Sequence, residues 1–508
     1  MIKKLNEPKC LPAIAPNSPS NWHICYCHAP SALILALLLF LGLRPSRLLK
    51  NASNFSYKDR VFGKKETGGQ EEFWIETRRL PKLSAGRFFQ RVEELLGEIG
   101  FGEQVHRLCR PAYSQRADGR PGLDPVVYFK MLMVGFFENL PSERAIAARC
   151  EDSLAVRAFL GYGLEEATPD HSSLSVIRRR LPPETYQAVF ELILKALKDC
   201  GLLKGRYVGI DSSVIEANAS LKSLAERNTE EAYWEYVKKL AQAAGIDPED
   251  DQAVRQFDRK RPGKKLSNEQ FKNRHDPDAK ISRQKGKTDL IYKPENSVDM
   301  ESGAIIQAQL VAADQSDSVD LPQRISSTQE CLEQLEVGKK IKAVVADRNY
   351  HSLANVCELQ QAGLKVVIAD GSAHKRQEHR LPQSERQALQ KARQALQSKT
   401  GRKLMRLRGQ QIERSFAHIL DCGGMRKATL RGRVNLQKRY VFATACYNLS
   451  QLLRLKFGCG TLKMALACAL TRWLQHWLSL IALFQRSLPI HSSNFPYLLC
   501  SPARSPSP

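Results

Sequence analysis

The sequence predicts an α/β domain that follows an all-α N-terminal region. Between residues 75 and 200 the hydrophobic residues recur at helical spacing, as they do over 88–99. Beyond residue 200, short β-branched runs alternate with helical patterns, which is typical of a sheet with some parallel pairing. Two of the predicted strands end in an aspartate, at Asp211 and Asp347. These two strand ends are the first candidate for a functional site.

Composition points to a polyanionic partner. The chain has 508 residues, 43% of them hydrophobic, and a formal net charge of +24. A charge of this size is most often a feature of proteins that bind nucleic acid, although a merely basic surface is the alternative. The 13 cysteines include no C-x-x-C pair. This pattern argues against a zinc site or a disulfide framework and favours reduced thiols in a cytosolic setting.

The two ends differ in composition from the middle. Residues 1–62 are rich in Pro, Ser and Asn and contain one apolar run, 32–43, which is too short for a membrane span of about 20 residues. We interpret 1–62 as a disordered or non-native extension. The tail from 458 is apolar and is either non-native sequence or an amphipathic packing helix. The predicted division is 1–62, a helical DNA-binding domain over 63–200, a catalytic domain over 201–457 with a basic insertion at 371–408, and the tail 458–508.

The helical region shows clear start signals. Asp124 and Pro125 have the residue types of an N-cap and a first helical position, and they predict a core helix over 126–139. A second helix is expected to begin at Pro141 and to run through Cys150. A third, over 174–181, ends in three arginines, Arg178, Arg179 and Arg180. These arginines suit DNA phosphates, and a solvated helix end is an equally good interpretation.

The α/β region begins with the strand 207–210, which leads to Asp211. Residues 218–288 are charged and rich in turns, so we expect a helix over 226–244. The basic stretch 259–287 should follow it as a phosphate-contacting connection or a solvated loop. A hairpin is predicted from strands 290–292 and 304–312, with its turn at 301–303.

The remaining elements alternate between helix and strand. Helices are expected over 319–335, 353–362, 384–397, 407–420 and 436–457, and strands over 342–346 and 364–368. Residues 375–408 hold eleven Lys or Arg and two Glu, a strong basic bias. The helix over 407–420 carries Glu413 and ends before Gly423 and Gly424.

Three carboxylates suggest metal-dependent chemistry. Strand-end aspartates at one sheet edge are suitable ligands for hard divalent cations, and Glu413 on a helix would add a third carboxylate. Two Mg²⁺ ions held in this way can activate a nucleophile and stabilise a leaving oxygen at a phosphodiester. Competing candidates are Glu216, Asp299, Asp314 and Asp370, each of which could instead be a solvated acid. Glu413 could also be a surface residue paired with Arg414 or Lys427.

Other common reaction classes lack their motifs. The sequence contains no Walker lysine loop and no G-x-G-x-x-G, so nucleotide hydrolysis and dinucleotide binding are unsupported. It also contains no G-x-S-x-G nucleophile elbow.

Three stretches together resemble a known family over residues 63–457. They are Gly119-Arg-Pro-Gly122 with Pro169-Asp-His-Ser-Ser-Leu-Ser175, then Gly209-Ile-Asp-Ser-Ser-Val-Ile-Glu-Ala-Asn218, and finally Val345-Ala-Asp-Arg-Asn-Tyr350 with Ile412-Glu-Arg-Ser-Phe416. This pattern resembles the bacterial insertion-sequence transposases of the DDE type, which have a ribonuclease H-like catalytic domain. The resemblance implies nicking at the terminal inverted repeats of the element, followed by transfer of a 3′-hydroxyl into target DNA.

The resemblance also implies a site and partners. Asp211, Asp347 and Glu413 match the metal-binding triad, which is implied to bind two Mg²⁺ ions, with Mn²⁺ as a substitute. The implied partner is double-stranded DNA, bound by a homodimer or higher oligomer in the cytoplasm at the nucleoid, without a membrane. Candidate DNA contacts are Arg178, Arg179, Arg180, Lys280, Arg402, Lys403 and Arg414.

The chain departs from some relatives around Glu413. Those relatives carry an Arg four residues before the Glu and a Lys seven residues after it, where this chain has Gly409 and Leu420. Arg406 or Arg408 could substitute for the arginine. Two alternative functions therefore stay open: a catalytically inactive DNA-binding relic, and a two-metal nuclease that cuts without joining.

Overall fold

A computed structural model describes residues 84–113, 122–261, 267–284, 286–371 and 378–487. The predicted extension 1–62, with its apolar run, lies outside these residues. So do positions 372–377 of the basic insertion and the tail beyond 487. The description that follows concerns the unit that begins at Pro81.

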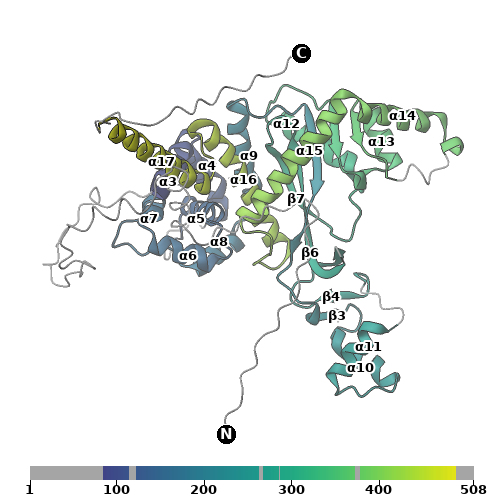
Figure 1. Ribbon diagram of the computed structural model, residues 1–508. Coiled ribbons are helices and arrows are strands. Elements are labelled where there is room, and N and C mark those ends of the chain that lie inside the picture. Colours follow the sequence, from purple (N-terminus) through teal and green to yellow (C-terminus); the bar gives the residue numbers. More distant parts are fainter. Residues whose placement is uncertain (1–83, 114–121, 262–266, 285, 372–377, 488–508) are drawn as a thin grey trace, which may run out of the picture. The chain divides into compact units, whose positions relative to one another are not determined.

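The first part of this unit is helical, as the sequence predicts (Figure 1). Its elements are α3 (Ser84–Glu98), α4 (Phe101–Cys109), the 3₁₀ turn η2 (Arg110–Ala112), α5 (Pro125–Phe137), α6 (Glu143–Asp152), α7 (Leu154–Leu160), α8 (His171–Arg180) and α9 (Pro183–Asp199). The predicted start at Asp124 is confirmed, because its carboxylate accepts a hydrogen bond from the Val126 amide at 2.7 Å. Helix α5 is apolar on nearly all sides and is the buried centre of this region.

The second part is built on a seven-stranded mixed sheet. Its strands are β1 (Tyr207–Ser212), β2 (Ile215–Glu216), β5 (Lys280–Gln284), β6 (Lys287–Asp299), β7 (Ile305–Val311), β8 (Ala343–Ala346) and β9 (Lys365–Ile368). Strand β6 pairs antiparallel with both β7 and β1, and β1, β8 and β9 pair in parallel. Five strands therefore follow the order β7–β6–β1–β8–β9, which is a ribonuclease H-like mixed sheet. The predicted hairpin is confirmed as β6 and β7.

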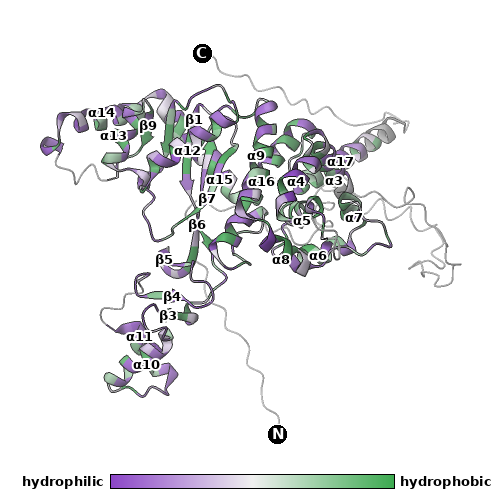
Figure 2. Cartoon of the chain, turned by 180° about the vertical axis from the view of Figure 1, so that it is seen from behind, coloured by the Kyte–Doolittle hydropathy of each residue, from purple (hydrophilic) through white to green (hydrophobic). Residues whose placement is uncertain are grey.

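Helices and short turns cover the sheet and extend it. They are α12 (Leu321–Gln334), η4 (Arg348–Tyr350), α13 (Leu353–Gln361), η6 (Glu378–Arg380), α14 (Gln383–Gln397), α15 (Lys399–Ala417), the π-helical turn η7 (His418–Cys422) and α16 (Arg433–Phe457). Helices α13 and α14 contact β9, and α15 contacts β1 and β8. In Figure 2 the hydrophobic colour follows the strands and the inward helix faces, as expected of a sheet buried beneath helices.

Two close contacts fix the helices on the sheet. A Cβ atom on Gly209 of β1 would lie 2.9 Å from Ile412 Cδ1, so the glycine lets α15 cross β1 at short range. Helix α16 contacts α9 on one side and β7 on the other. Its buried Tyr440 hydroxyl donates to Asn296 at 2.8 Å, and Asn448 exchanges hydrogen bonds with the Ile305 backbone. Helix α16 therefore joins the helical region to the sheet.

Residues 218–288 differ from the prediction. They contain η3 (Leu221–Ser223), β3 (Leu224–Glu226), α10 (Tyr233–Ala243), α11 (Asp251–Lys260) and β4 (Phe271–Asn273). The expected helix over 226–244 begins seven residues late, because Ala225 is buried and pairs with β4. The basic stretch 259–287 is not an open loop, since β4 and β5 fall within it. In Figure 1 these elements lie together below β6.

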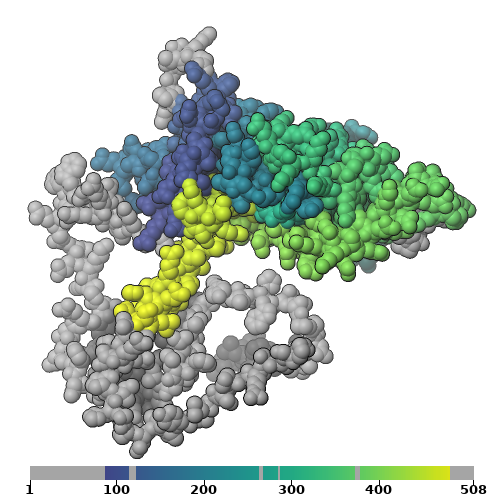
Figure 3. All heavy atoms as spheres, turned by 90° about the horizontal axis from the view of Figure 1, so that it is seen from above, coloured from purple at the N-terminus to yellow at the C-terminus, as the bar shows by residue number. Residues whose placement is uncertain are grey.

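The tail begins with one long helix, α17 (Leu462–Ser487). It contacts α3, and Figure 3 shows it in yellow, extending away from the helices that it contacts. Residues 471–480 are all exposed, so α17 is only partly the packing helix that its composition allowed. None of the helices in the described residues is both long enough and apolar enough to cross a membrane.

Candidate active site

Asp211 lies at the end of the central strand, β1. Its Cα pairs with that of Asn296 on β6, and its carboxylate accepts a hydrogen bond from the Ser212 amide at 2.9 Å. The apolar residues before it, Val208 and Ile210, are fully buried. The strand thus carries the aspartate from the core to the edge of the sheet, where 22% of its side chain is exposed.

Asp347 follows the neighbouring strand, β8, and occupies the N-cap position of η4 without a side-chain capping hydrogen bond. Strands β1 and β8 are parallel, and their register pairs Ile210 with Ala346. The next residue on each strand is therefore an aspartate, on strands about 4.8 Å apart. The prediction that these two aspartates reach the same sheet edge is confirmed.

Arg408 of α15 joins the two aspartates. Its Nη1 lies 2.7 Å from Asp211 Oδ2, and its Nη2 lies 3.8 Å from Asp347 Oδ1. Residues 404, 408 and 412 follow one another at helical spacing, and Leu404 and Ile412 are buried against the sheet. Arg408 is thus directed to the sheet by the same helix face. Its Nε is buried and has no hydrogen-bond partner within the described residues.

The environment of Asp211 disfavours its ionised form. Burial is the largest cause and raises the pKa of this carboxyl to about 6. Arg408 opposes the shift, whereas the nearby carboxylates of Asp347 and Asp317 add to it. A cation of higher charge than one guanidinium would favour the ionised forms of both Asp211 and Asp347.

Glu413 lies apart from this pair. It is exposed, and its Oε1 points back along α15 to within 3.8 Å of the position that a Cβ on Gly409 would occupy. Successive residues on an α-helix are separated by about 100°, so Glu413 is turned away from the face on which Ile412 contacts β1. Within the described residues, no group of three or more acidic, His or Cys side chains is placed to hold a metal ion. The expected triad is therefore two neighbouring aspartates and a third carboxylate that does not reach them.

Sequence reasoning missed two further acids beside Asp211. Asp317 accepts a hydrogen bond from Ser212 Oγ at 2.8 Å and pairs with Lys293 Nζ at 2.7 Å. It follows β7 in a loop with three aspartates, Asp314, Asp317 and Asp320, and that clustering after a predicted strand was the available signal.

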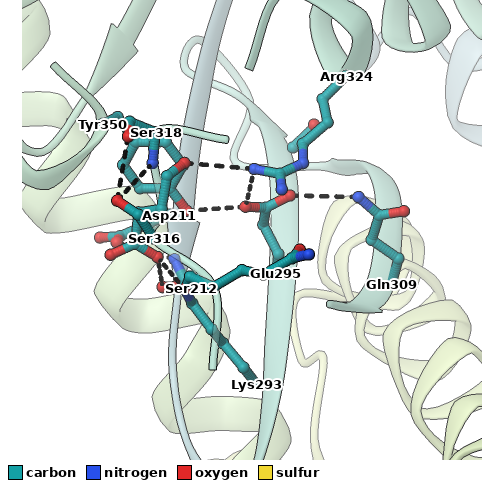
Figure 4. A network of polar contacts seen from close by, with 12 residues as sticks. Asp211, Ser212, Lys293, Glu295, Gln309, Ser316, Ser318, Arg324 and Tyr350 are labelled. Carbon is teal, nitrogen blue, oxygen red and sulfur yellow. Dashed lines mark hydrogen bonds and ion pairs between the residues drawn. The ribbon is translucent and has the colours of Figure 1, made fainter. Parts of the chain in front are cut away.

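Glu295 of β6 is the second missed acid. It is 3% exposed and accepts hydrogen bonds from Arg324 at 2.8 Å, Tyr350 at 2.9 Å and Gln309 at 3.2 Å. Burial raises the pKa of Glu295 despite its pairing with Arg324. Figure 4 shows Glu295 and Asp211 in one polar network around Tyr350.

The four competing acids have other partners. Asp299 is fully buried and accepts hydrogen bonds from the Lys204 and Glu301 amides, so it stabilises the β6–β7 turn. The other three form ion pairs: Glu216 with Lys427 at 3.0 Å, Asp314 with Lys280 at 3.2 Å, and Asp370 with Arg393 at 3.7 Å. Glu216 and Asp314 are partly exposed, as expected of surface or turn acids, whereas the Asp370 side chain is buried and also lies 3.6 Å from His351.

The three arginines that end α8 have different surroundings. Arg178 forms an ion pair with Glu143 and is largely buried, so it does not belong to a solvent-facing arginine row. Arg179 is exposed, and the Arg180 guanidinium lies 4.8 Å from the Tyr113 ring centroid. Only Arg179 and Arg180 of the expected row are accessible cations, because Arg178 is paired with Glu143 and largely buried.

The other candidate DNA contacts lie on the sheet and on α15. Lys280 of β5 is paired with Asp314. Arg402, Lys403 and Arg414 are exposed on the same helix that carries Arg408. Helix α15 thus presents an inward arginine at the aspartates and outward cations to solvent.

Two family models match the chain, and together they cover more than half of it. A transposase domain (DUF772) matches residues 78–180, and a transposase DDE domain matches residues 256–449. The chain belongs to the insertion-sequence DDE transposases. Comparison with curated proteins and with solved structures finds no significant match.

The matched ranges of this transposase correspond to its two structural parts. The first covers α3 to α8, and the second includes β6 to α15 and most of α16. Asp347 and Glu413 fall inside the DDE match, whereas Asp211 lies between the two matches. Asp211 is placed in the candidate site by the strand register beside Asp347 and by its contact with Arg408.

Proposed function

We propose that this transposase cleaves DNA strands at the terminal inverted repeats of an insertion sequence and transfers the freed 3′-hydroxyl into target DNA. Asp211 and Asp347 are its first two metal ligands, and Glu413 is the third. The observation that carries the proposal is the pairing of the two aspartates around a single cation, Arg408.

The two aspartates fit a divalent cation in their chemistry. They offer carboxylate oxygens, which Mg²⁺ and Mn²⁺ prefer, and they attract positive charge strongly enough to hold a guanidinium between them. Bound divalent cations would activate the attacking water or hydroxyl and stabilise the leaving oxygen. The buried strands β1 and β8, paired in register up to Ile210 and Ala346, hold the backbones of the two aspartates side by side.

Glu413 needs a local change to contribute. A turn of its side chain from the Gly409 side towards the sheet would bring a third carboxylate to the edge, on a helix already anchored by Ile412. Release of Arg408 from Asp211 would open the same space. The exposed cations Arg179, Arg402, Lys403 and Arg414 would contact the phosphates of the bound duplex.

A catalytically inactive DNA-binding relic is the second candidate. The observation that favours it is the position of Glu413, which does not join the two aspartates. A relic of this kind would retain the basic surface and bind the element ends without cutting them.

The test is cleavage of an end-labelled duplex that carries the element's own ends, in Mg²⁺ and in EDTA. The full chain is compared with Asp347→Ala, and with Asp314→Ala as the matched control, because Asp314 is an aspartate outside the site. Nicking that requires metal and is lost only in Asp347→Ala supports the proposal. Tight binding without nicking favours the relic, and nicking without joining of the labelled 3′-end favours a nuclease.

A further inference from the structure

Two hollows lie side by side next to strand β2. One has a volume of about 450 Å³ and is lined by residues that include Lys427, Thr429 and the ion pair of Arg426 with Asp421. The other has a volume of about 510 Å³ and is lined by residues that include Lys222, His275 and Arg431. Asn218 and Lys427 line both, so the hollows adjoin each other. We call this surface the β2 groove.

The backbone fixes the floor of the groove. Residues 426–428 run beside β2, where the Glu216 amide donates to the Arg426 carbonyl at 3.1 Å and the Ala428 amide donates to the Glu216 carbonyl at 2.7 Å. Asn218 donates to the Thr429 carbonyl at 3.1 Å. The backbone of residues 426–429 is therefore held beside β2, and Arg431 Nε donates to the Asn218 carbonyl at 3.2 Å.

The second hollow is positively charged without compensation in its lining. Its charged side chains are Lys222, Lys427 and Arg431, joined by His275, and its lining residues include no carboxylate. Lys427 is paired with Glu216 at the rim. Neither Lys222 nor Arg431 forms an ion pair with a carboxylate of the described residues, and Asn218, Ser220 and Ser223 add neutral hydrogen-bonding groups. This composition suits a chain of phosphates.

The rim of the groove, at Glu216, lies at a defined distance from Asp211 along β6. Asp211 pairs with Asn296, and Glu216 pairs with Ile291, five positions further along the same strand. At about 3.4 Å per residue this separation is roughly 17 Å. Duplex DNA advances about 3.4 Å per base pair, so the same distance corresponds to about five base pairs.

We propose that the β2 groove binds the phosphate backbone of duplex DNA about five base pairs from the phosphate that lies at Asp211 and Asp347. Lys222 and Arg431 provide its uncompensated contacts. The proposal rests on the proposed function for the position of the cleaved phosphate. None of the groove cations is among the DNA contacts that the sequence predicted, because they come from three separate segments that meet only in the fold.

The test measures how the affinity for an element-end duplex depends on salt. Each phosphate contact to B-DNA adds about 0.9 to the slope of log K against log salt concentration. Lys222→Gln with Arg431→Gln should lower the magnitude of this slope by about 1.8, and Lys222→Gln alone by about half as much. The control is Lys339→Gln with Lys340→Gln, which removes the same charge at the opposite end of β8 from Asp347. It should leave the slope almost unchanged.

The position is tested by phosphate ethylation interference on the same duplex. In the wild type, ethylation near the fifth phosphate from the cleavage point should weaken binding, and the double variant should lose that sensitivity. The single variant Lys222→Gln keeps the test valid if loss of the Arg431 contact with the Asn218 carbonyl disturbs the fold.

The outcomes separate this proposal from the proposed function. Wild-type protein that nicks in Mg²⁺, with an unchanged slope and unchanged interference in both groove variants, would overturn the groove alone. An equal fall of the slope in the Lys339 and Lys340 control would also overturn it, because the effect would then be general charge. Wild-type protein that binds the duplex and loses slope in the groove variants, but never nicks, would support the groove and contradict the cleavage.

Discussion

Two acid–arginine pairs lie close together on this sheet, and they differ in almost every other respect. Glu295 and Arg324 are 3% and 12% exposed, and Glu295 accepts hydrogen bonds from three side chains. Asp211 and Arg408 are also paired, at 2.7 Å, but Arg408 shares its charge with Asp347, whose side chain is 40% exposed. The Arg408 Nε has no partner within the described residues, and the Asp211 carboxyl has a pKa raised to about 6.

We interpret the first pair as structural and the second as part of the proposed active site. A buried pair stabilises a fold only when hydrogen bonds satisfy both partners, as they do around Glu295. The Asp211 pair leaves one donor unsatisfied and two carboxylates competing for one cation. The strands β1 and β8 fix the backbones of these aspartates, but the side chains of the site do not satisfy all of its charges and donors. The site can therefore accept a ligand of higher charge.

The largest expected effect is on catalysis. Asp211→Asn keeps the size of the side chain but removes the charge of a proposed metal ligand, so metal-dependent nicking should fall on the order of a thousandfold. The far-ultraviolet circular dichroism and the affinity for the element ends should stay close to those of the wild type. Asp299→Asn should instead damage stability, since Asp299 is a buried turn residue. Normal nicking by Asp211→Asn would contradict the proposed role of Asp211 as a metal ligand.

The next effect concerns stability. Glu295→Ala leaves Arg324 buried without its carboxylate and Tyr350 without its acceptor, so the free energy of unfolding should fall by about 3–5 kcal/mol. Urea denaturation measures this change. Asp347→Ala is the matched control, and it should cost less than about 1 kcal/mol because the side chain is partly exposed and contacts Arg408 only at 3.8 Å. Equal losses in the two variants would contradict the assignment of separate roles.

The pH dependence of the free energy of unfolding should reveal the raised pKa of Asp211 in metal-free protein. Because the folded pKa of Asp211 lies about two units above its ordinary value, the folded state binds the proton more tightly than the unfolded state does. The stability of the wild type relative to Asp211→Asn is therefore fully present below about pH 4, falls as pH rises from 4 to 6, and is lost above pH 6. The expected loss between pH 4 and pH 8 is about 2.4 kcal/mol, measured by urea denaturation at each pH. A relative stability that rises with pH would have the wrong sign.

The smallest expected effect tests Arg408 itself. Arg408→Gln removes the cation that competes for Asp211 and Asp347, so the affinity for Mn²⁺ should rise about tenfold, equivalent to about 1.4 kcal/mol. Titration calorimetry measures this affinity without any reliance on cleavage. Arg406→Gln, an exposed arginine two residues earlier on the same helix, should leave it unchanged. Weaker Mn²⁺ binding by Arg408→Gln would mean that the arginine supports the metal site instead of competing with it.

Much of the architecture could be predicted because it is written in local patterns. Alternating β-branched runs and helical spacings mark the mixed α/β class, the β6–β7 hairpin and most helices, and Asp124 marks the start of α5. The strands that end at Asp211 and Asp347 are recognisable for the same reason: an apolar run followed by an acid is a property of adjacent residues. The strand β3 was missed because a pairing with β4, more than forty residues away, overrides the helical pattern that follows it.

The sequence by itself therefore determined the fold class, the transposase resemblance and the two aspartates at one sheet edge. Only the tertiary structure decided which cation lies between them, that Glu295 is a satisfied structural acid, and that Glu413 faces away. Each of these depends on the rotation of a helix or the register of a strand against a distant partner. A one-residue difference in either would turn the side chain to another face, and no local pattern records it.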